Sequence, residues 1–494
     1  MNRFRELLIK NYFILFTIFA AIPIFFTPNT WDSAILLYAF DIENLNGVES
    51  WFKEAGIYFQ FFVIQILFLI KKTLHINHEF LFDVFTIGSL ILFTYEVKKY
   101  SEQFFSLDNK WSNFCAILVI TFPVWPSLNS VNLALYVFCF YLALVGHRLF
   151  FSKNFFVKLI ALLLILFSFS IKSNLAFVIG LSFIHVLKNY FEKKILILNN
   201  FLILITLSSA AYIVDINYFP PSGFYSGYNQ IKINEIDIFL IAKSFYNFCT
   251  FFIFYLWIPI IFLFLIKLKN INFQIKNVFI DSNYILIFLI FCASVAPYCL
   301  LGRYTDLFYF SEYTGRHAYL VSISFGLFFA ILFKNIAKNY FNKKYMYIFM
   351  SILVIQNLLI LSIGQYSKIE SAIFKQDFVK KIKKLNIQEG KVLIINKSII
   401  IDSHEINYLF YKAYGKAAWN GEFTKNEKKK DIKIEKKILN NQKYKTYRII
   451  DDYKNDCISI LKTKNELSRA DRFKKLYILN YKKYYLLELL ESNC

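Results

Sequence analysis

Residues 195–213, with the sequence ILILNNFLILITLSSAAYI, form an apolar run that directly follows Lys193 and Lys194. The hydrocarbon core of a bilayer is about 30 Å thick, and a helix needs about 20 mostly apolar residues to cross it. Similar runs occur at 251–266 and 284–300. Lys-rich loops flank these runs on one side, and loops rich in Tyr, Trp, Asp and Ser flank them on the other. The pattern predicts a polytopic membrane protein.

The composition agrees with this prediction. Hydrophobic residues make up 57% of the 494 residues, and the mean hydropathy is +0.45, well above that of a soluble globule. The formal net charge is +22, but most lysines lie in short loops beside apolar segments, where they orient helices in a membrane. We therefore expect the lipid bilayer, and no nucleic acid, as a partner.

Lysine clusters set the expected orientation, because positively charged loops stay on the cytoplasmic side. Arg3, Arg5 and Lys10 place the N-terminus inside, so the first span is expected at 12–28 and an outside loop at 29–55. Four later clusters are assigned to the cytoplasm, at 147–158, 188–194, 267–276 and 334–344. This alternation leaves everything after Gly364 outside.

Twelve apolar segments can be read from the sequence, at 12–28, 57–70, 80–95, 114–126, 131–145, 155–171, 175–186, 195–213, 251–266, 284–300, 319–333 and 347–363. An even number of membrane crossings would return the tail to the side of the N-terminus, which conflicts with an inside N-terminus and an outside tail. One segment between 57 and 95 is therefore expected to be interfacial or re-entrant, or one span has been missed. The expected fold class is an all-α polytopic bundle of about 11 to 13 transmembrane helices.

Two domains are expected. Residues 1–365 form the transmembrane domain, with extracytoplasmic loops at 29–55, 214–236 and 301–317. Residues 366–494 are polar and Lys-rich, with short β-like runs at 392–396 and 458–461. This pattern predicts a small C-terminal α/β domain outside the membrane.

No metal or nucleotide site is predicted. The seven cysteines lack the short paired spacing of a metal site, and whether Cys457 and Cys494 in the tail form a disulfide stays open. The sequence contains no P-loop, no dinucleotide fingerprint and no HExxH motif. This disfavours nucleotide-driven pumping by this chain.

The first outside loop offers candidate catalytic carboxylates. Trp31 and Asp32 lie immediately beyond the first span, and Glu43, Glu49 and Glu54 follow before Gly56. A carboxylate at the membrane surface beside an aromatic ring can act as a general base toward a sugar hydroxyl. The alternative is an interfacial tryptophan belt with a polar helix stop.

Arginine use singles out the loop at 301–317. Between Arg148 and Arg448 the only arginines are Arg303 and Arg316, both in this outside loop. Lys is the usual cation of this chain, so two Arg in an outside loop suggest a planar, bidentate contact to phosphate or carboxylate. His317 adds a donor or proton carrier. The alternative is pairing of these arginines with Asp306 and Glu312 inside the loop.

Three further residues belong to outside segments. Tyr225 and Tyr228 lie in an aromatic, turn-rich loop that suits a sugar ring, although such a loop also suits the headgroup region. Lys172 lies at an outside turn, where it either faces the same cavity or snorkels. Asp83, inside an apolar segment, is expected to face the bundle interior or to mark the doubtful span.

This arrangement resembles the GT-C superfamily of polytopic glycosyltransferases. The likeness rests on Asp32 in the motif Asn-Thr-Trp-Asp-Ser, on the segment 51–56 (WFKEAG) before the next apolar run, on the Arg/His loop, and on the polar tail. The superfamily's usual paired acidic motif is missing here, since Asp32 is followed by Ser33, so the need for a divalent cation stays open.

The resemblance implies sugar transfer at the outer face of a bacterial cytoplasmic membrane, from a polyprenyl-phosphate donor to a glycan, lipid or protein acceptor. Asp32, with Glu54 as the second carboxylate, would be catalytic. The donor phosphate would be bound by four residues: Arg303, Arg316, His317 and Lys172. The sugar or acceptor would be bound by Trp31, Tyr225, Tyr228 and Glu312.

Two other readings remain. An O-antigen-type polymerase is also polytopic and Arg-dependent, but it usually keeps its large outer loop between spans. A transporter or flippase of lipid-linked sugars would be expected to show paired halves, broken spans and charges at mid-membrane.

Overall fold

The computed structural model describes residues 12–26, 33–129, 131–192, 198–226, 237–269, 276–279, 281–303, 313–339 and 343–384, and short pieces of the tail at 392–395, 408–409, 411–413, 424–425 and 446–449. The chain forms two compact units. Unit 1 comprises Met1–Phe25 and Glu49–Gln365, and unit 2 comprises Phe26–Val48 and Tyr366–Cys494. The predicted first outside loop, 29–55, is thus divided between them.

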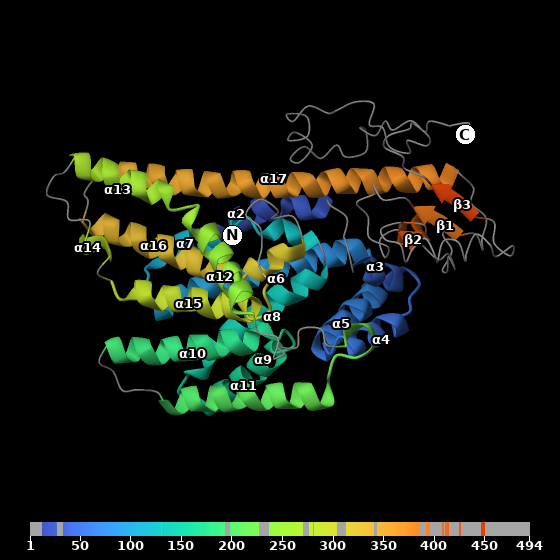
Figure 1. Cartoon of the computed structure of the whole chain (residues 1–494), viewed down its shortest axis with the longest axis horizontal. Coiled ribbons are helices and arrows are strands. Elements are labelled where there is room, and N and C mark those ends of the chain that lie inside the picture. Colours follow the sequence, from blue (N-terminus) through green and yellow to red (C-terminus); the bar gives the residue numbers. More distant parts are fainter. Residues whose placement is uncertain are drawn as a thin grey trace. The chain divides into compact units, whose positions relative to one another are not determined.

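Unit 1 is helical throughout its described residues (Figure 1). Its α-helices, two of which continue into unit 2, are α2 (Phe13–Ala21), α4 (Asn46–Glu54), α5 (Tyr58–Leu74), α6 (His78–Phe104), α7 (Asn109–Ile120), α8 (Val131–Phe150), α9 (Phe155–Ser168), α10 (Ser173–Phe191), α11 (Leu198–Tyr218), α12 (Ile238–Ile253), α13 (Trp257–Lys269), α14 (Lys276–Phe279), α15 (Asn283–Cys299), α16 (Val321–Asn339) and α17 (Lys343–Lys384). Short 3₁₀ helices are η1 (Ile22–Phe26), η2 (Trp125–Asn129), η3 (Gly223–Tyr225) and η5 (Tyr313–Ala318).

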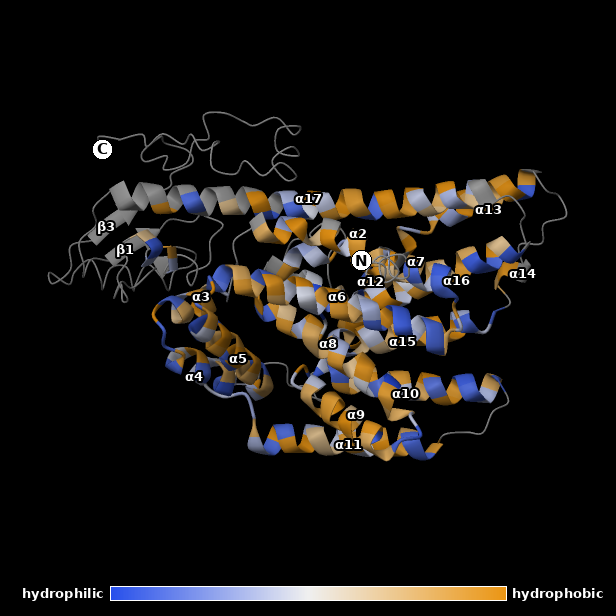
Figure 2. Cartoon of the chain, turned by 180° about the vertical axis from the view of Figure 1, so that it is seen from behind, coloured by the Kyte–Doolittle hydropathy of each residue, from blue (hydrophilic) through white to orange (hydrophobic). Residues whose placement is uncertain are grey.

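Six helices are long and apolar enough to cross a membrane: His78–Phe104, Val131–Phe150, Ser173–Phe191, Leu198–Tyr218, Val321–Lys338 and Tyr345–Tyr366. Shorter apolar helices occupy Phe13–Phe25, Phe155–Ser168, Trp257–Leu268 and Asn283–Cys299. Figure 2 shows mostly hydrophobic residues along α9 and α11, and only 11% of the apolar window of α11 is buried. Such an exposed apolar surface is suited to lipid. The prediction of an all-α multi-pass membrane protein is confirmed.

The helices of unit 1 share two ends. Ser127 of η2, just before α8, is 2.5 Å from the Tyr319 hydroxyl, and Ser173 at the start of α10 accepts a hydrogen bond from Tyr298 near the end of α15. Therefore α8, α10 and α16 begin where α15 ends. We call this the arginine end, because Arg303 and Arg316 follow α15 and precede α16, and the opposite end the lysine end.

Helices α6 and α8 run parallel. The rings of Phe85 and Phe138 are 5.7 Å apart, and those of Tyr100 and His147 are 5.9 Å apart, so later residues of α6 meet later residues of α8. Helix α6 therefore begins at the arginine end, as α8 does. The half-buried Asp83 in its second turn lies near that end, away from the bilayer centre.

A buried ion pair joins α6 to α8. Arg148 donates from Nε and from one terminal nitrogen to the two oxygens of Glu96, whose side chain is 2% exposed. A bidentate Arg–carboxylate contact has the planar geometry that such pairs prefer. Because a buried charge without its partner is costly, the pair fixes the level at which the two helices meet.

Helix α5 starts and finishes at the arginine end. Its first residues pack against residues at the ends of α11 and α9: Tyr58 is 4.8 Å from Phe219, and Phe59 is 4.6 Å from Phe167 between ring centroids. Its last residue, Leu74, is followed within four residues by the start of α6 at the same end. The apolar segment 57–70 thus forms a helix that stays at one end of unit 1. This agrees with the expectation that one segment between 57 and 95 does not cross.

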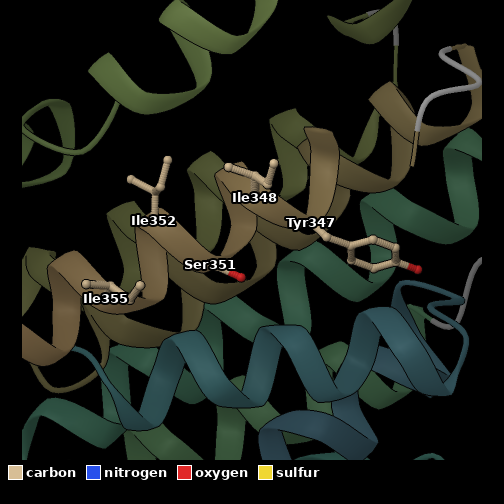
Figure 3. A pocket seen from close by; sticks show the side chains of 5 residues that line it. All are labelled: Tyr347, Ile348, Ser351, Ile352 and Ile355. Carbon is tan, nitrogen blue, oxygen red and sulfur yellow. The ribbon is translucent and has the colours of Figure 1, made fainter. Parts of the chain in front are cut away.

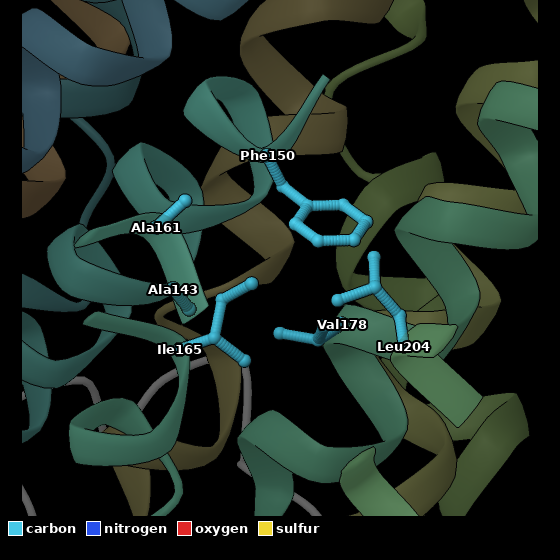
Figure 4. Close-up of a cluster of buried hydrophobic side chains, with 6 residues drawn as sticks. All are labelled: Ala143, Phe150, Ala161, Ile165, Val178 and Leu204. Atoms are coloured by element: carbon cyan, nitrogen blue, oxygen red, sulfur yellow. The ribbon is translucent and has the colours of Figure 1, made fainter. Parts of the chain in front are cut away.

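Close helix contacts form the core. Figure 4 shows one cluster that joins four successive helices, with Ala143 and Phe150 from α8, Ala161 and Ile165 from α9, Val178 from α10 and Leu204 from α11. At Gly326 in α16, a Cβ atom would lie 2.8 Å from the carbonyl oxygen of Cys115 in α7. Small residues let helix backbones approach closely in membranes, so Gly326 sets the α7–α16 contact.

The predicted single span at 251–266 is wrong in one respect. The structure divides it into α12 and α13, with a turn at 254–256. Tyr255 in this turn is fully buried, and its ring packs edge-on against Phe325 at 4.9 Å. The tertiary contact of Tyr255 accompanies the break, which hydropathy alone does not reveal.

Unit 2 contains α3 (Ser33–Asp41) and three short strands of the tail, β1 (Val392–Ile395), β2 (Thr424–Lys425) and β3 (Thr446–Ile449). The strands are parallel in the order β2-β1-β3, with Val392 opposite Thr446. The Tyr408 hydroxyl donates to Asp41, so the first loop and the tail are joined within this unit. The predicted strand at 458–461 lies outside the described residues.

Replacing Arg148 by Met should lower stability by about 3–5 kcal/mol, because Glu96 would remain buried without its partner. The purified variant should lose thermal stability, measured as the unfolding temperature in one detergent. The double variant Glu96→Gln/Arg148→Met should recover part of the loss. Lys153→Met, at an exposed position, is the matched control and should change little. Equal stability of the Arg148 and Lys153 variants would contradict a structural role for the pair.

A cysteine introduced at His75, between α5 and α6, should react with a membrane-impermeant maleimide from the same side as a cysteine at Ser222. A cysteine at Lys153, between α8 and α9, should react only from the opposite side. The experiment is done in a background whose native cysteines are replaced. Labelling of the His75 variant from the Lys153 side would mean that α5 crosses the membrane.

Candidate functional site

The end of α15 positions Arg303. Gly302 adopts a left-handed conformation with φ of +63°, and its N–H bonds to the Cys299 carbonyl while the Arg303 N–H bonds to the Tyr298 carbonyl at 2.8 Å. These two bonds form a Schellman motif, which favours glycine at the left-handed position. The backbone of Arg303 is therefore fixed directly beyond the helix.

Arg316 and His317 lie in η5, just before α16. Their side chains are 6% and 4% exposed. The His317 ring packs against the Tyr298 ring, with 4.8 Å between centroids. Tyr298 thus contacts both parts of the predicted arginine loop, through its backbone at Arg303 and through its ring at His317. We call Tyr298, Arg303, Arg316, His317 and Tyr319 the arginine site.

Tyr319 anchors the arginine site to η2. Its ring stacks on Trp125 at 5.0 Å, and its hydroxyl is 2.5 Å from the Ser127 hydroxyl. Burial raises the pKa of Tyr319 above its ordinary value, and the hydrogen bond with Ser127 and the positive charge of Arg316 oppose that rise.

Lys172 links the arginine site to α11. The ammonium of Lys172 is 2.7 Å from the carboxylate of Asp215. The next residue, Ser173, accepts a hydrogen bond from the Tyr298 hydroxyl at 3.4 Å. Lys172 therefore lies between the arginine site and the end of α11, in an ion pair that the sequence does not predict.

A second cluster lies where α4 meets the loop after α11. Trp51 donates from Nε1 to the Tyr225 hydroxyl at 2.6 Å, and the Ser222 N–H bonds to the Glu54 carbonyl at 2.8 Å. Gly223, with φ of +55°, packs so closely on Glu54 that a Cβ atom would lie 2.7 Å from the carboxylate. We call Trp51, Glu54, Gly223 and Tyr225 the aromatic-loop site.

The contacts connect the two clusters within unit 1. The Tyr298 hydroxyl bonds to Ser173, and the neighbouring Lys172 pairs with Asp215. One helical turn after Asp215, Phe219 packs against Tyr58, which lies next to the aromatic-loop site. Six predicted site residues therefore gather at the arginine end: Glu54, Lys172, Tyr225, Arg303, Arg316 and His317. The other four, Trp31, Asp32, Tyr228 and Glu312, lie outside the described residues.

Sequence reasoning missed several residues of these clusters, namely Trp51 as a hydrogen-bond donor, Ser127, Ser173, Asp215, Tyr298 and Tyr319. They are common residue types at helix ends, so composition does not mark them. The one available signal was position: Tyr298 lies five residues before Arg303, and Tyr319 lies three after Arg316.

The lysine end holds a different buried polar group. His147 of α8 is fully buried, and its ring lies 5.9 Å from Tyr100 and 6.2 Å from His185. Neither nitrogen of His147 has a hydrogen-bond partner in the described part of the chain. The six predicted site residues that the structure describes lie at the other end, so this group is separate from the arginine site.

Two cavities lie elsewhere, along α17. Figure 3 shows one of about 620 Å³ along α17, lined by Tyr347, Ile348, Ser351, Ile352 and Ile355. A second, of about 470 Å³, shares Ile352 and Ile355 and extends toward Trp257 of α13. The linings are almost wholly apolar and include no predicted site residue. Such grooves on a membrane-spanning helix suit lipid chains.

Within the described residues, no group of three or more His, Cys, Asp or Glu is arranged to hold a metal ion. Comparison of the chain with protein-family models, curated proteins and solved structures gives no match. The arginine site and the aromatic-loop site are the two polar clusters on which a function is proposed below.

Replacing Gly223 by Ala should destabilise the protein by about 1–2 kcal/mol through its left-handed backbone, and it should also displace the Glu54 carboxylate. The matched control is Gly47→Ala in α4, where a Cβ atom meets nothing within 4 Å, and which should be neutral or slightly stabilising. Unfolding temperatures of the two purified variants check this. Equal stability would mean that the loop does not pack on Glu54 as described.

Proposed function

We propose that the chain is a membrane glycosyltransferase that moves a sugar from a polyprenyl-phosphate donor to a cell-envelope glycan, lipid or protein acceptor. The observation that carries the proposal is the arginine site at one end of the bundle, where the Arg303 backbone and the His317 ring both contact Tyr298 and the buried Arg316 precedes His317. The resemblance to the GT-C superfamily supports the same reading.

The arginine site suits a phosphate group. A guanidinium offers a rigid fork of donors that matches phosphate oxygens, and it is more weakly hydrated than an ammonium. Arg316 is 6% exposed, so its charge is shielded from water and acts more strongly on a bound anion. We assign to Arg316 and Arg303 the stabilisation of the phosphate that leaves during transfer. Binding by Lys172 requires that phosphate replace Asp215 as its partner.

The aromatic-loop site suits a sugar. Trp51 and Tyr225 combine aromatic faces with a hydroxyl, and Glu54 adds a carboxylate. In the proposed step an acceptor hydroxyl loses its proton to Asp32 and its oxygen bonds to the anomeric carbon. The bond from that carbon to the phosphate oxygen breaks, and the phosphate leaves with the electron pair. Direct displacement of this kind inverts the anomeric carbon, and Glu54 is the second candidate carboxylate.

The proposed setting is the bacterial cytoplasmic membrane, with the N-terminus inside and the arginine end outside. The described residues then make eleven crossings, by α2, α6, α7, α8, α9, α10, α11, the pair α12 and α13, α15, α16 and α17. The lysine end carries the clusters assigned to the cytoplasm. The C-terminal α/β domain is proposed to be extracytoplasmic and to bind the acceptor, and a divalent cation stays open as a cofactor.

A transporter or flippase of lipid-linked sugars is the second candidate. One observation favours it: the crossing formed by α12 and α13 is interrupted at 254–256. Discontinuous helices often mark transport sites in membranes. An O-antigen-type polymerase gains no specific support from the arrangement.

The test is transfer of labelled sugar from synthetic polyprenyl-phosphate sugars by the purified protein in nanodiscs. Arg316→Lys should lower kcat/KM about 10- to 100-fold, because Lys keeps the charge and loses the fork. Asp32→Asn should abolish transfer, because an amide cannot accept the proton. Insertion and the unfolding temperature should stay unchanged in both.

The matched control is Lys153→Gln, an exposed cation at the lysine end, which should transfer as the wild type does. Undiminished turnover by the Asp32 variant would remove Asp32 as the base. Movement of intact lipid-linked sugar across the membrane without transfer would favour the transporter reading.

A further inference from the structure

Asn132, the second residue of α8, has a buried amide without a partner. Its side chain is 8% exposed, and neither its amide nitrogen nor its amide oxygen has a hydrogen-bond partner in the described part of the chain. Buried polar groups are nearly always hydrogen-bonded, and leaving one unsatisfied costs free energy. A buried amide with both functions unused calls for a ligand or an ordered water that uses them.

The helical periodicity places Asn132 on the face of α8 that meets the arginine site. Asn132, Tyr136 and Phe140 follow one another four residues apart and so share one face. The ring of Phe140 meets Tyr319 edge-on at 6.5 Å, and the ring of Tyr136 lies 6.4 Å from that of Phe140. Asn132 lies one turn beyond Tyr136 toward the arginine end.

Asn174, the second residue of α10, has a similar position. It is fully buried, its amide nitrogen donates to the Ser168 carbonyl at 2.9 Å, and its amide oxygen has no partner among the described residues. Its neighbour Ser173 bonds to Tyr298 of the arginine site. Helices α8 and α10 are packed together, with Ala143 and Val178 in one cluster (Figure 4).

The unused atoms define the ligand chemistry. A primary amide offers two donors and one acceptor, and a hydroxyl group both donates and accepts. A phosphate has acceptors only and would leave the amide oxygens of Asn132 and Asn174 unsatisfied. A metal ion would prefer several carboxylate or imidazole ligands, and the described residues offer no such group. The hydroxyl groups of a sugar ring can accept from the amide nitrogen and donate to the amide oxygen, so a sugar uses both functions of the amide.

We propose that Asn132 and Asn174 bind hydroxyl groups of the transferred sugar and so determine which sugar the site accepts. This inference rests on the proposed function, because the arginine site holds the phosphate to which that sugar is attached. The two amides come from two helices of the bundle, so their spacing is set by helix packing and is insensitive to movement of the outside loops.

The test compares Asn132→Leu with Asn189→Leu. Asn189 in α10 is also buried, also has an unpartnered amide nitrogen, and lies toward the lysine end. Both replacements remove an unsatisfied polar group without adding one, so both should fold and raise the unfolding temperature. Only Asn132→Leu should lose transfer, about 10- to 100-fold in kcat/KM, and it should discriminate less between a sugar and its deoxy analogue.

If the wild type and the Asn132→Leu variant transfer sugar equally well, the inference is overturned and the proposed function stands. A wild type that transfers no sugar removes the proposed function, and direct binding then decides the inference. The probes are glucose, galactose and mannose 1-phosphates, read as ligand-dependent shifts of the unfolding temperature. Stabilisation of the wild type and of Asn189→Leu, but not of Asn132→Leu, supports the sugar site. Equal shifts, or none, in all three overturn it.

Discussion

The bidentate ion pair between Glu96 and Arg148 is the interaction on which the arrangement of unit 1 depends. Glu96 is removed from water, and its charge would cost several kcal/mol in the bundle interior without the half-buried Arg148 as its partner. Their pairing fixes the level at which α6 and α8 meet, and the contacts of Phe85 with Phe138 and of Tyr100 with His147 show that the two helices run in the same direction. Helix α7 must then return the chain between them, and α6 must start at the arginine end. Helix α5 is consequently confined to that end, beside the aromatic-loop site.

Much of the fold could be predicted from the sequence, because apolar length and lysine position are read directly from it. The described residues of the clusters at 147–158, 188–194 and 334–344 fall at the lysine end. The sequence could not decide which segment between 57 and 95 stays at one end, because 57–70 has the apolar content of a spanning helix. Its path is marked by the contacts of Tyr58 with Phe219 and of Phe59 with Phe167, and hydropathy contains no information about such contacts. The turn within 251–266 escaped prediction for the same reason, since it accompanies the packing of Tyr255 on Phe325.

The candidate site could be predicted only where composition is unusual. Arg303, Arg316 and His317 stood out because arginine is rare in this chain, and Glu54 and Tyr225 because their loops are polar and aromatic. The residues that hold them in place, Ser173, Tyr298 and Tyr319, are ordinary residues at helix ends. Their roles arise from helix packing that brings α10, α15 and α16 together. An unpartnered amide such as that of Asn132 becomes recognisable only when its surroundings are known.

Two of the six tryptophans lie within these clusters. Trp125 stacks on Tyr319 and donates its indole N–H to the Val119 carbonyl at 2.7 Å, and Trp51 donates its own to Tyr225. Indole emission is sensitive to hydrogen bonding and to local polarity. The molecule therefore carries two intrinsic fluorophores, one beside the arginines and one in the aromatic loop. Occupancy of each cluster can be followed optically, without an attached dye, once the remaining indoles are replaced by phenylalanine.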